Sequence, residues 1–267
     1  MMAALAESEL DGRERILREV IGEAGRLAQD WFERRASLEV ALKGPQDYAS
    51  EADAAVERVI RRRLAEAFPD DAFLGEEEGG EVGERVWVAD PIDGTANFVR
   101  GVTRYCVSLA FVADGRVQLG AIVSPATNEL YLARRGRGAT LNGAPLRTAA
   151  TDRIERAAIE IGWSSRHPYA DYLRVIERML EAGADFRRFG SGAMGLASVA
   201  DGRADAYLEL HINSWDCLAG ILLVEEAGGR VNDFLANDGL RRGNPILACA
   251  PGVADAIAKL AGVPLLP

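Results

Sequence analysis

Histidine is scarce in this chain of 267 residues, which contains only His167 and His211. Because zinc sites commonly draw on several imidazole or thiolate ligands, a histidine-rich zinc centre is nearly excluded. A Ser-His-Asp triad would have to use one of these two residues, and neither has a recognisable partner motif. We therefore predict that both histidines are structural or surface residues.

Cysteine and long apolar runs are also rare. Cys106, Cys217 and Cys249 are far apart and odd in number, which argues against a disulfide framework and for a reducing compartment. No apolar run reaches the roughly 18 residues that suggest a membrane span. The first residues, MMAALAESELDG, do not form a basic segment followed by an apolar one, as a secretion signal would. These features predict a soluble cytoplasmic protein with no membrane association.

Positive charge is outweighed, with 31 Lys and Arg residues against 41 Asp and Glu residues and a net charge of -10. Nucleic-acid binding through a basic surface is therefore not expected. Hydrophobic residues make up 48% of the chain, which is enough for a large core in one domain or in two closely packed halves. We predict one domain over residues 1–267, with halves of about 1–150 and 151–267 that meet near TDRIER, residues 151–156.

Hydrophobic periodicity predicts helices at residues 9–35, 50–68, 169–182, 193–200, 218–227 and 253–260. Ser50 and Asp53 resemble a capping box, so Asp53 is expected to cap the second helix. Strands are expected at 72–74, 86–89 and 204–210, an antiparallel meander at 106–146, and a turn at 43–45. Together these elements predict a mixed α+β or α/β protein in which helices cover the sheets.

The segment DPIDGTANF, residues 90–98, places two carboxylates three residues apart directly after an apolar run. If Pro91 turns the chain at the end of a strand, Asp93 comes to the same side as Asp90. Carboxylates so close repel one another unless a cation lies between them. Hard divalent cations take oxygen ligands, to which the carbonyl group of Ile92 could be added. An ordinary Asp-rich turn that caps a helix is the alternative.

Gly94 and Thr95 extend this segment toward phosphate binding. A glycine lets the backbone approach a ligand closely. A helix that begins at Thr95 would offer free amides to a phosphate group, beside the threonine hydroxyl.

Further carboxylates occur at other element boundaries. Glu76 and Glu77 follow a short strand, Asp47 lies just before a predicted helix, and Asp216 precedes an apolar helix. Each has an ordinary alternative as part of a solvated face or as a helix cap.

Taken together, these segments resemble the motifs of the inositol monophosphatase family of magnesium-dependent phosphatases. The matching segments are FLGEEEGG at 73–80, DPIDGTANF at 90–98 and SWDCLAGILLVEEAGG at 214–229. Three motifs in this order and with these gaps are highly specific, and the resemblance extends from residue 47 to residue 229. It implies a layered αβαβα sandwich, a single phosphatase domain with its site between the two halves.

The resemblance also implies roles for individual residues. The implied ligands of two or three Mg²⁺ ions are Glu76, Asp90, the Ile92 carbonyl, Asp93 and Asp216. Glu76 and Thr95 would position the attacking water, and Asp47 would orient a metal-bound water or Thr95. The implied substrate contacts are the Gly94 and Thr95 amides for phosphate, and Gly190, Ser191, Gly192, Glu209 and Asp216 for the rest of the substrate. For Glu209 an exposed strand residue is the alternative.

The sequence departs from the family pattern at several positions. Ala96 stands where a second threonine is common, Gly192 replaces a common alanine, and Glu78-Gly79-Gly80 replaces a more usual serine. The run VRGVTRYC, residues 99–106, also differs from the inositol-type pattern. None of these changes removes an implied metal ligand, but they leave the substrate open.

We therefore predict a magnesium-dependent phosphatase for a small phosphorylated metabolite of the inositol 1-phosphate type, acting through metal-activated water. The alternative substrates are histidinol phosphate, fructose 1,6-bisphosphate and a 3'-phosphoadenosine nucleotide, although the sequence locates no aromatic or basic pocket for adenosine. A catalytically silent, metal-binding regulatory protein and a calcium-binding structural module are the alternatives from other classes. The resemblance further implies a homodimer and inhibition by lithium.

Overall fold

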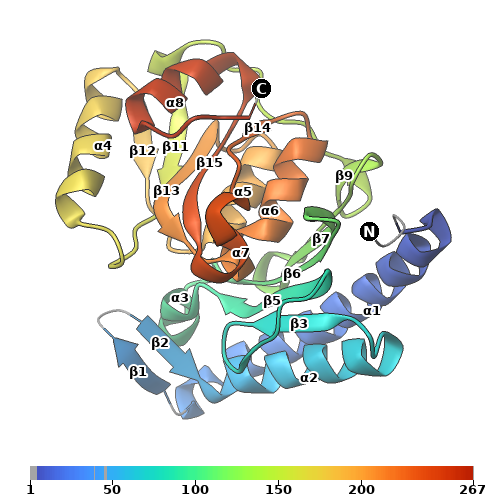
Figure 1. The fold of residues 1–267 in the computed structure, drawn as a ribbon. Coiled ribbons are helices and arrows are strands. Elements are labelled where there is room, and N and C mark those ends of the chain that lie inside the picture. The colour runs from blue at the N-terminus through green and yellow to red at the C-terminus, as the bar shows by residue number, and fades with distance from the viewer. Residues whose placement is uncertain (1–4, 39, 45–46, 267) are drawn as a thin grey trace.

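Helices and sheets alternate in five layers, in the order helix, sheet, helix, sheet, helix (Figure 1). The computed structural model describes residues 5–38, 40–44 and 47–266. Three separate apolar clusters fill the spaces between the layers. The predicted αβαβα architecture is therefore confirmed.

The first layer consists of α1 (Glu7–Glu33) and α2 (Glu51–Ala67), which cover one face of the larger sheet. Their buried residues repeat at helical spacing, for example Val20 with Ala24 and Val56 with Ile60. This apolar stripe packs on Trp87 and other residues of the sheet. Burial of one helical face is the usual source of stability for such helices.

The larger sheet has eight strands in the order β10-β9-β8-β7-β6-β5-β3-β4. Only β3 and β5 run parallel to each other, and the other pairs are antiparallel. Its strands are β3 (Ala72–Gly75), β4 (Gly79–Gly80), β5 (Arg85–Asp93), β6 (Cys106–Ala113), β7 (Arg116–Ser124), β8 (Glu129–Arg134), β9 (Gly138–Leu141) and β10 (Ala144–Pro145). Every residue of β6 is buried, because helices cover both faces of the sheet.

The middle layer holds α5 (Gly192–Ala200) and α6 (Ser214–Glu226), between the two sheets. Small residues let these elements approach closely. A Cβ at Gly120 on β7 would lie 2.9 Å from the carbonyl oxygen of Ala219 on α6. A Cβ at Gly220 would collide with the Cβ of Leu196 on α5. Helix α6 therefore touches both its neighbours through backbone surfaces.

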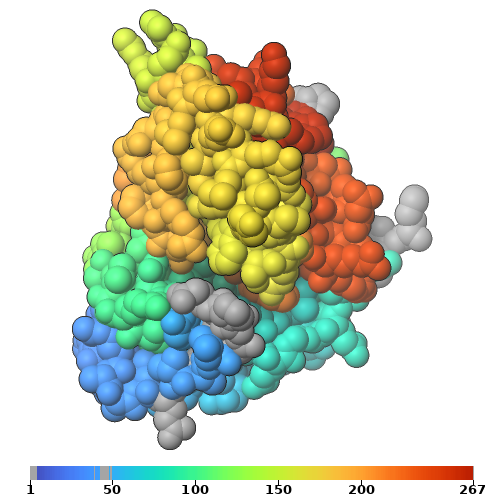
Figure 2. Space-filling view, turned by 90° about the vertical axis from the view of Figure 1, so that its left-hand side faces the viewer, coloured from blue at the N-terminus to red at the C-terminus, as the bar shows by residue number. Residues whose placement is uncertain are grey.

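The smaller sheet has five strands in the order β12-β11-β13-β15-β14. They are β11 (Ala158–Ile161), β12 (Asp185–Arg187), β13 (Ala206–Ile212), β14 (Arg230–Val231) and β15 (Asn244–Cys249). Helices α4 (Tyr169–Glu181) and α8 (Ala254–Ala261) cover its outer face. Figure 2 shows α4, in yellow, on the outside of the C-terminal half, above the N-terminal segments in blue.

Three short elements complete the fold. Strands β1 (Val40–Gly44) and β2 (Asp47–Ser50) form a separate antiparallel pair. Helix α3 (Thr95–Arg100) follows β5, and α7 (Gly239–Arg242) precedes β15. No helix of the described residues is long and apolar enough to span a bilayer.

All six predicted helices and the antiparallel meander are present, with three differences from the prediction. Strand β5 continues to Asp93 instead of ending before Asp90, because an irregular register between these residues accommodates Pro91. Helix α6 begins at Ser214, so Asp216 lies within its first turn. Several strands were missed, namely β1, β2, β4, β11, β12, β14 and β15. Part of the turn predicted at 43–45 lies outside the described residues.

We expect Gly220→Ala to lower the free energy of unfolding by about 1–3 kcal/mol, because the added methyl group overpacks the contact between α5 and α6. Gly12→Ala is the control, since Gly12 lies inside α1 with nothing within 4 Å of an added Cβ. That change should raise stability by about 0.5–1 kcal/mol through helix propensity. Urea unfolding measures both effects, and equal effects would contradict the packing described here.

Candidate metal and phosphate site

Carboxylates from three separate elements converge between the two sheets. Glu76 directly follows β3, Asp90 belongs to β5, and Asp216 lies in the first turn of α6. One oxygen from each of the three lies within 4.8 Å of the other two. The structure therefore brings three of the predicted metal ligands together.

Burial and mutual repulsion shift the acidity of this cluster. Asp90 is only 1% exposed, and its pKa is raised well above its ordinary value by burial and then by the charges of Glu76, Asp93 and Asp216. Burial, followed by the charge of Asp93, raises the pKa of Asp216 to about 7. These shifts are typical of buried anionic groups that lie close to one another. The all-oxygen donor set is of the kind that Mg²⁺ takes in proteins.

Asp93, the fourth predicted carboxylate ligand, is held by the start of α5. Its Oδ2 accepts hydrogen bonds from the Ser191 hydroxyl at 2.6 Å and from the Ala193 amide at 2.7 Å. The thiol of Cys106 lies 3.8 Å from the same oxygen. Asp93 is not one of the three clustered carboxylates, but its charge still contributes to the raised pKa values of Asp90 and Asp216.

Thr95 connects the β5 segment to α2. Its hydroxyl lies 3.0 Å from the Ile92 carbonyl oxygen and 3.2 Å from Oδ1 of Asp53. The Ile92 amide in turn donates to Oδ1 of Asp90 at 2.9 Å. These bonds hold the Ile92 carbonyl, a further predicted ligand, next to the carboxylate cluster.

A contact with Thr95, of the kind predicted for Asp47, is made by Asp53, while the role of Asp47 itself stays a prediction. Asp47 begins β2, and its side chain lies outside the described residues. Asp53 forms the predicted capping box with Ser50, but its second carboxylate oxygen also accepts from Thr95. Burial raises the pKa of Asp53 to about 6. The capping interpretation was therefore correct but incomplete, because capping uses only one of the two oxygens.

Gly94 adopts a conformation that favours glycine, with φ of 91° at the N-cap of α3. An added Cβ would lie 2.9 Å from the carbonyl oxygen of Arg104. The tight turn brings Thr95 to the first position of α3.

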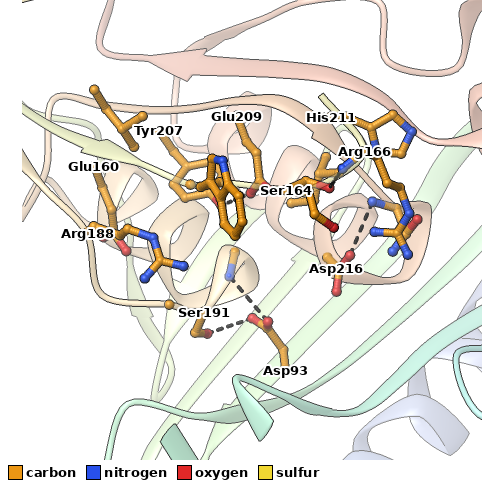
Figure 3. A pocket seen from close by; sticks show the side chains of 18 of the residues that line it. Asp93, Glu160, Ser164, Arg166, Arg188, Ser191, Tyr207, Glu209, His211 and Asp216 are labelled. Carbon is orange, nitrogen blue, oxygen red and sulfur yellow. Dashed lines mark hydrogen bonds between the residues drawn. The ribbon is translucent and has the colours of Figure 1, made fainter. Parts of the chain in front are cut away.

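A pocket of about 570 Å³ opens beside the cluster and is lined by Glu76, Asp93 and Asp216. The segment Gly190, Ser191 and Gly192 also lines it, as the resemblance implied. Glu209 lies on β13 in the same wall and is 8% exposed, so the alternative of an exposed strand residue is wrong. Figure 3 shows Asp93 and Asp216 below Glu209 and Tyr207.

The carboxyl group of Glu209 accepts a hydrogen bond of 2.7 Å from the Tyr207 hydroxyl. Burial raises the pKa of Glu209 to about 8, and the charges of Asp216 and Asp93 act in the same direction. Below this pH the group is mainly protonated, so it can both donate and accept a hydrogen bond.

Comparison with known proteins identifies the family of this chain. The model of the inositol monophosphatase family matches residues 10–261. The chain belongs to the inositol monophosphatase family.

Individual relatives carry two kinds of name. A protein of Xylella fastidiosa named Nus factor SuhB is 42% identical over 82% of this chain and 80% of its own length. An inositol-1-monophosphatase of Rhizobium meliloti is 40% identical over 82% of this chain and 84% of its own length. The crystal structure of the extragenic suppressor protein SuhB from Bartonella henselae matches with a TM-score of 0.86, 34% identity and coverage of 92% of this chain and 97% of that one.

Close packing explains one departure from the family pattern, the glycine at position 192. A Cβ at Gly192 would lie 2.8 Å from Cδ1 of Ile212 and 3.1 Å from the Tyr207 hydroxyl. Gly192 therefore suits the close packing of α5 against β13 in this member of the inositol monophosphatase family.

Several pocket residues were not predicted. The wall includes Trp163, Ser164, Arg166, Arg188 and Trp215, so an aromatic and basic pocket does exist. Glu160 is also present, and one of its oxygens lies 2.6 Å from a guanidinium nitrogen of Arg104. Most of these residues follow β11 and β12, two strands that the sequence did not reveal. Prediction of those strands would have placed IGWSSR, residues 161–166, at a strand end.

The two histidines have structural partners, as predicted. Nε2 of His167 lies 3.1 Å from Oδ2 of Asp171, one helical turn away. Nε2 of His211 lies 3.0 Å from the carbonyl oxygen of Arg242. His211 also lines the pocket, which the sequence did not indicate.

We expect Mg²⁺ binding at about pH 6 to release protons, because the raised pKa values of Asp90 and Asp216 keep protons in the metal-free site that a cation displaces. The folded metal-free protein thus binds more protons than the unfolded chain, so these groups make it less stable as pH rises from about 4 to about 7. Calorimetric titration in two buffers of different protonation enthalpy measures the release. It should fade well above pH 7 and decrease in Asp216→Asn, and its absence at pH 6 would contradict these pKa shifts.

Proposed function

We propose that this protein is a magnesium-dependent phosphatase that hydrolyses a small phosphate monoester such as inositol 1-phosphate. The observation that carries the proposal is the convergence of Glu76, Asp90 and Asp216 beside a 570 Å³ pocket. Membership of the inositol monophosphatase family supports the same chemistry. A structural relative described as inositol monophosphate-bound supports the substrate class. The expectation of a homodimer also stays a proposal.

The residues present fit two or three Mg²⁺ ions in their chemistry. Glu76, Asp90 and Asp216 would hold them, together with Asp93 and the Ile92 carbonyl. When bound, Mg²⁺ supplies positive charge that acidifies water and stabilises a departing alkoxide.

The chain's own groups have distinct tasks in this proposal. Glu76 and the Thr95 hydroxyl orient the attacking water, and Asp53 holds that hydroxyl in place. The backbone amides of Gly94 and Thr95 donate to the phosphate group. Glu209 binds a hydroxyl of the substrate alcohol, with its own orientation fixed by Tyr207.

We expect Asp93→Asn to lower turnover by about 10²-fold or more, because the variant loses a charge at the metal and phosphate site. An asparagine oxygen can still accept from Ser191 and Ala193, and the NH₂ group replaces only the acceptor of the longer, 3.3 Å bond from the Gly192 amide, so the variant should still fold. The assay is phosphate release with magnesium and with a chelator, on inositol 1-phosphate, histidinol phosphate, fructose 1,6-bisphosphate and 3'-phosphoadenosine 5'-phosphate. Wild-type turnover by the variant would refute the assignment of Asp93.

The relatives named Nus factor SuhB support a second candidate, a metal-binding regulatory protein without catalysis. The same panel separates the two candidates. Magnesium-dependent phosphate release from any compound favours the phosphatase. Magnesium binding without release from the whole panel favours the regulatory protein.

The basic residues of the pocket favour a particular group of substrates among the alternatives. Arg166 and Arg188 flank the pocket on opposite sides (Figure 3). Their charges act on Asp216 and Glu209 respectively, yet their guanidinium groups enter none of the ion pairs found among the described residues. Two available guanidinium groups suit a substrate whose alcohol carries a second anionic group, such as fructose 1,6-bisphosphate.

We expect Arg188→Gln to raise the KM for fructose 1,6-bisphosphate by about tenfold or more, through loss of a charge-assisted hydrogen bond. The KM for inositol 1-phosphate should change little, because that substrate has no second anion. Arg187→Gln is the matched control, since Arg187 pairs with Asp185 at 3.1 Å and does not line the pocket. An equal rise in KM for both substrates would indicate that Arg188 supports the shape of the pocket and does not bind the second anionic group.

A further inference from the structure

Glu57, on α2, is a fully buried carboxylate that none of the three sequence motifs contains. Its exposed fraction is 0%, in a part of the structure where a lone charge would be strongly disfavoured. Such a group requires specific partners. The nature of those partners indicates what the group does.

The partners of Glu57 lie in the segment that carries Glu76. One carboxylate oxygen accepts a hydrogen bond of 2.8 Å from the amide of Glu77, and the other accepts one of 3.0 Å from the amide of Glu78. The carboxylate of Glu57 thus spans two consecutive backbone amides. Two such bonds fix both the position and the orientation of the chain that follows Glu76.

The residue before Glu76 is fixed by the same carboxylate. Gly75 has room for no side chain, because an added Cβ would collide with the carboxyl group of Glu57. The Glu76 amide also donates to the carbonyl oxygen of Ala89 on β5, at 3.3 Å. Glu76 is therefore anchored to β5 on one side and to Glu57 on the other.

Arg61, one helical turn beyond Glu57, completes this arrangement. Its guanidinium group donates to Glu57 at 3.0 Å and to the carbonyl oxygen of Gly79 at 2.8 Å. It also lies over the ring of Phe73 on β3, 4.4 Å from the centroid. Glu57 and Arg61 together hold both ends of the β3–β4 turn, and the arginine compensates the buried negative charge.

We propose that Glu57 is a positioning residue, whose carboxylate holds residues 76–78 so that Glu76 faces Asp90 and Asp216. This inference rests on the proposed function, since it requires that Glu76 is a metal ligand. Asp53 lies one turn before Glu57 on α2 and holds Thr95. One rigid helix therefore orients both residues assigned to the attacking water.

The test is the affinity for Mg²⁺, measured by calorimetry without substrate. We expect Glu57→Gln to weaken binding by about 10- to 100-fold, as substitutions behind a metal ligand commonly do. Glutamine keeps the size of the side chain, but its NH₂ group would face one of the two amide donors. The variant should therefore lose Mg²⁺ affinity even under conditions in which it remains folded.

Asp71→Asn is the matched control. Asp71 is also a buried carboxylate paired with an arginine, with 2.8 Å between its Oδ1 and a guanidinium nitrogen of Arg13. It accepts a further bond from the indole of Trp87, and its hydrogen-bond partners in the described part of the chain do not include residues 76–78. This variant should lose stability while its Mg²⁺ affinity stays unchanged.

Three outcomes separate the possibilities. Weaker Mg²⁺ binding in Glu57→Gln but not in Asp71→Asn supports the positioning role. Unchanged binding in a folded Glu57→Gln protein overturns it and leaves the proposed function intact. Absence of Mg²⁺ binding by the wild-type protein overturns both.

Arg61→Gln keeps the test decisive if Glu57→Gln does not fold. The Arg61 side chain is 30% exposed, so its loss is less costly to the fold than the loss of a fully buried group. The variant loses the guanidinium that joins Glu57 to the Gly79 carbonyl. It should weaken Mg²⁺ binding in the same direction, and unchanged affinity in this variant would likewise overturn the proposal.

Discussion

Repulsion among buried carboxylates is the constraint on which the rest of this structure depends. The charges of Glu76, Asp93 and Asp216 raise the pKa of Asp90, and the charge of Asp93 raises the pKa of Asp216. Such a cluster is unfavourable unless a cation or protons neutralise it. The surrounding elements must therefore hold the carboxylates in place against a force that separates them.

The fold meets this constraint with donors from rigid elements. The start of α5 donates a hydroxyl and amides to Asp93, and α2 supplies Asp53 and Glu57 behind Thr95 and residues 76–78. These helices are themselves fixed by the apolar clusters on the two faces of the larger sheet. The geometry of the carboxylate cluster is thus coupled to the packing of the layers, because Glu76, Asp90 and Asp216 belong to three different parts of the fold.

Local sequence patterns were sufficient to predict an element or a motif wherever a single segment contains the whole pattern. The apolar stripes of α1 and α2, the turn residues of the meander, and the three motifs around Glu76, Asp90 and Asp216 could be read directly. Strands β11, β12 and β15 could not, because they are short and lie in a mixed sheet whose partners are distant in sequence. The missed pocket residues Arg166 and Arg188 follow two of these strands.

The sequence by itself determined the family, the order of the layers and the residue types that can bind a metal, because these depend on local patterns and on their spacing. Only the tertiary structure decided that Asp53 supports Thr95 and which side chains form the pocket wall. Asp53 was recognisable from sequence as a cap, but its second oxygen meets Thr95 only when α2 packs beside β5. Contacts between residues 42 positions apart depend on how whole layers pack, and no local pattern encodes them.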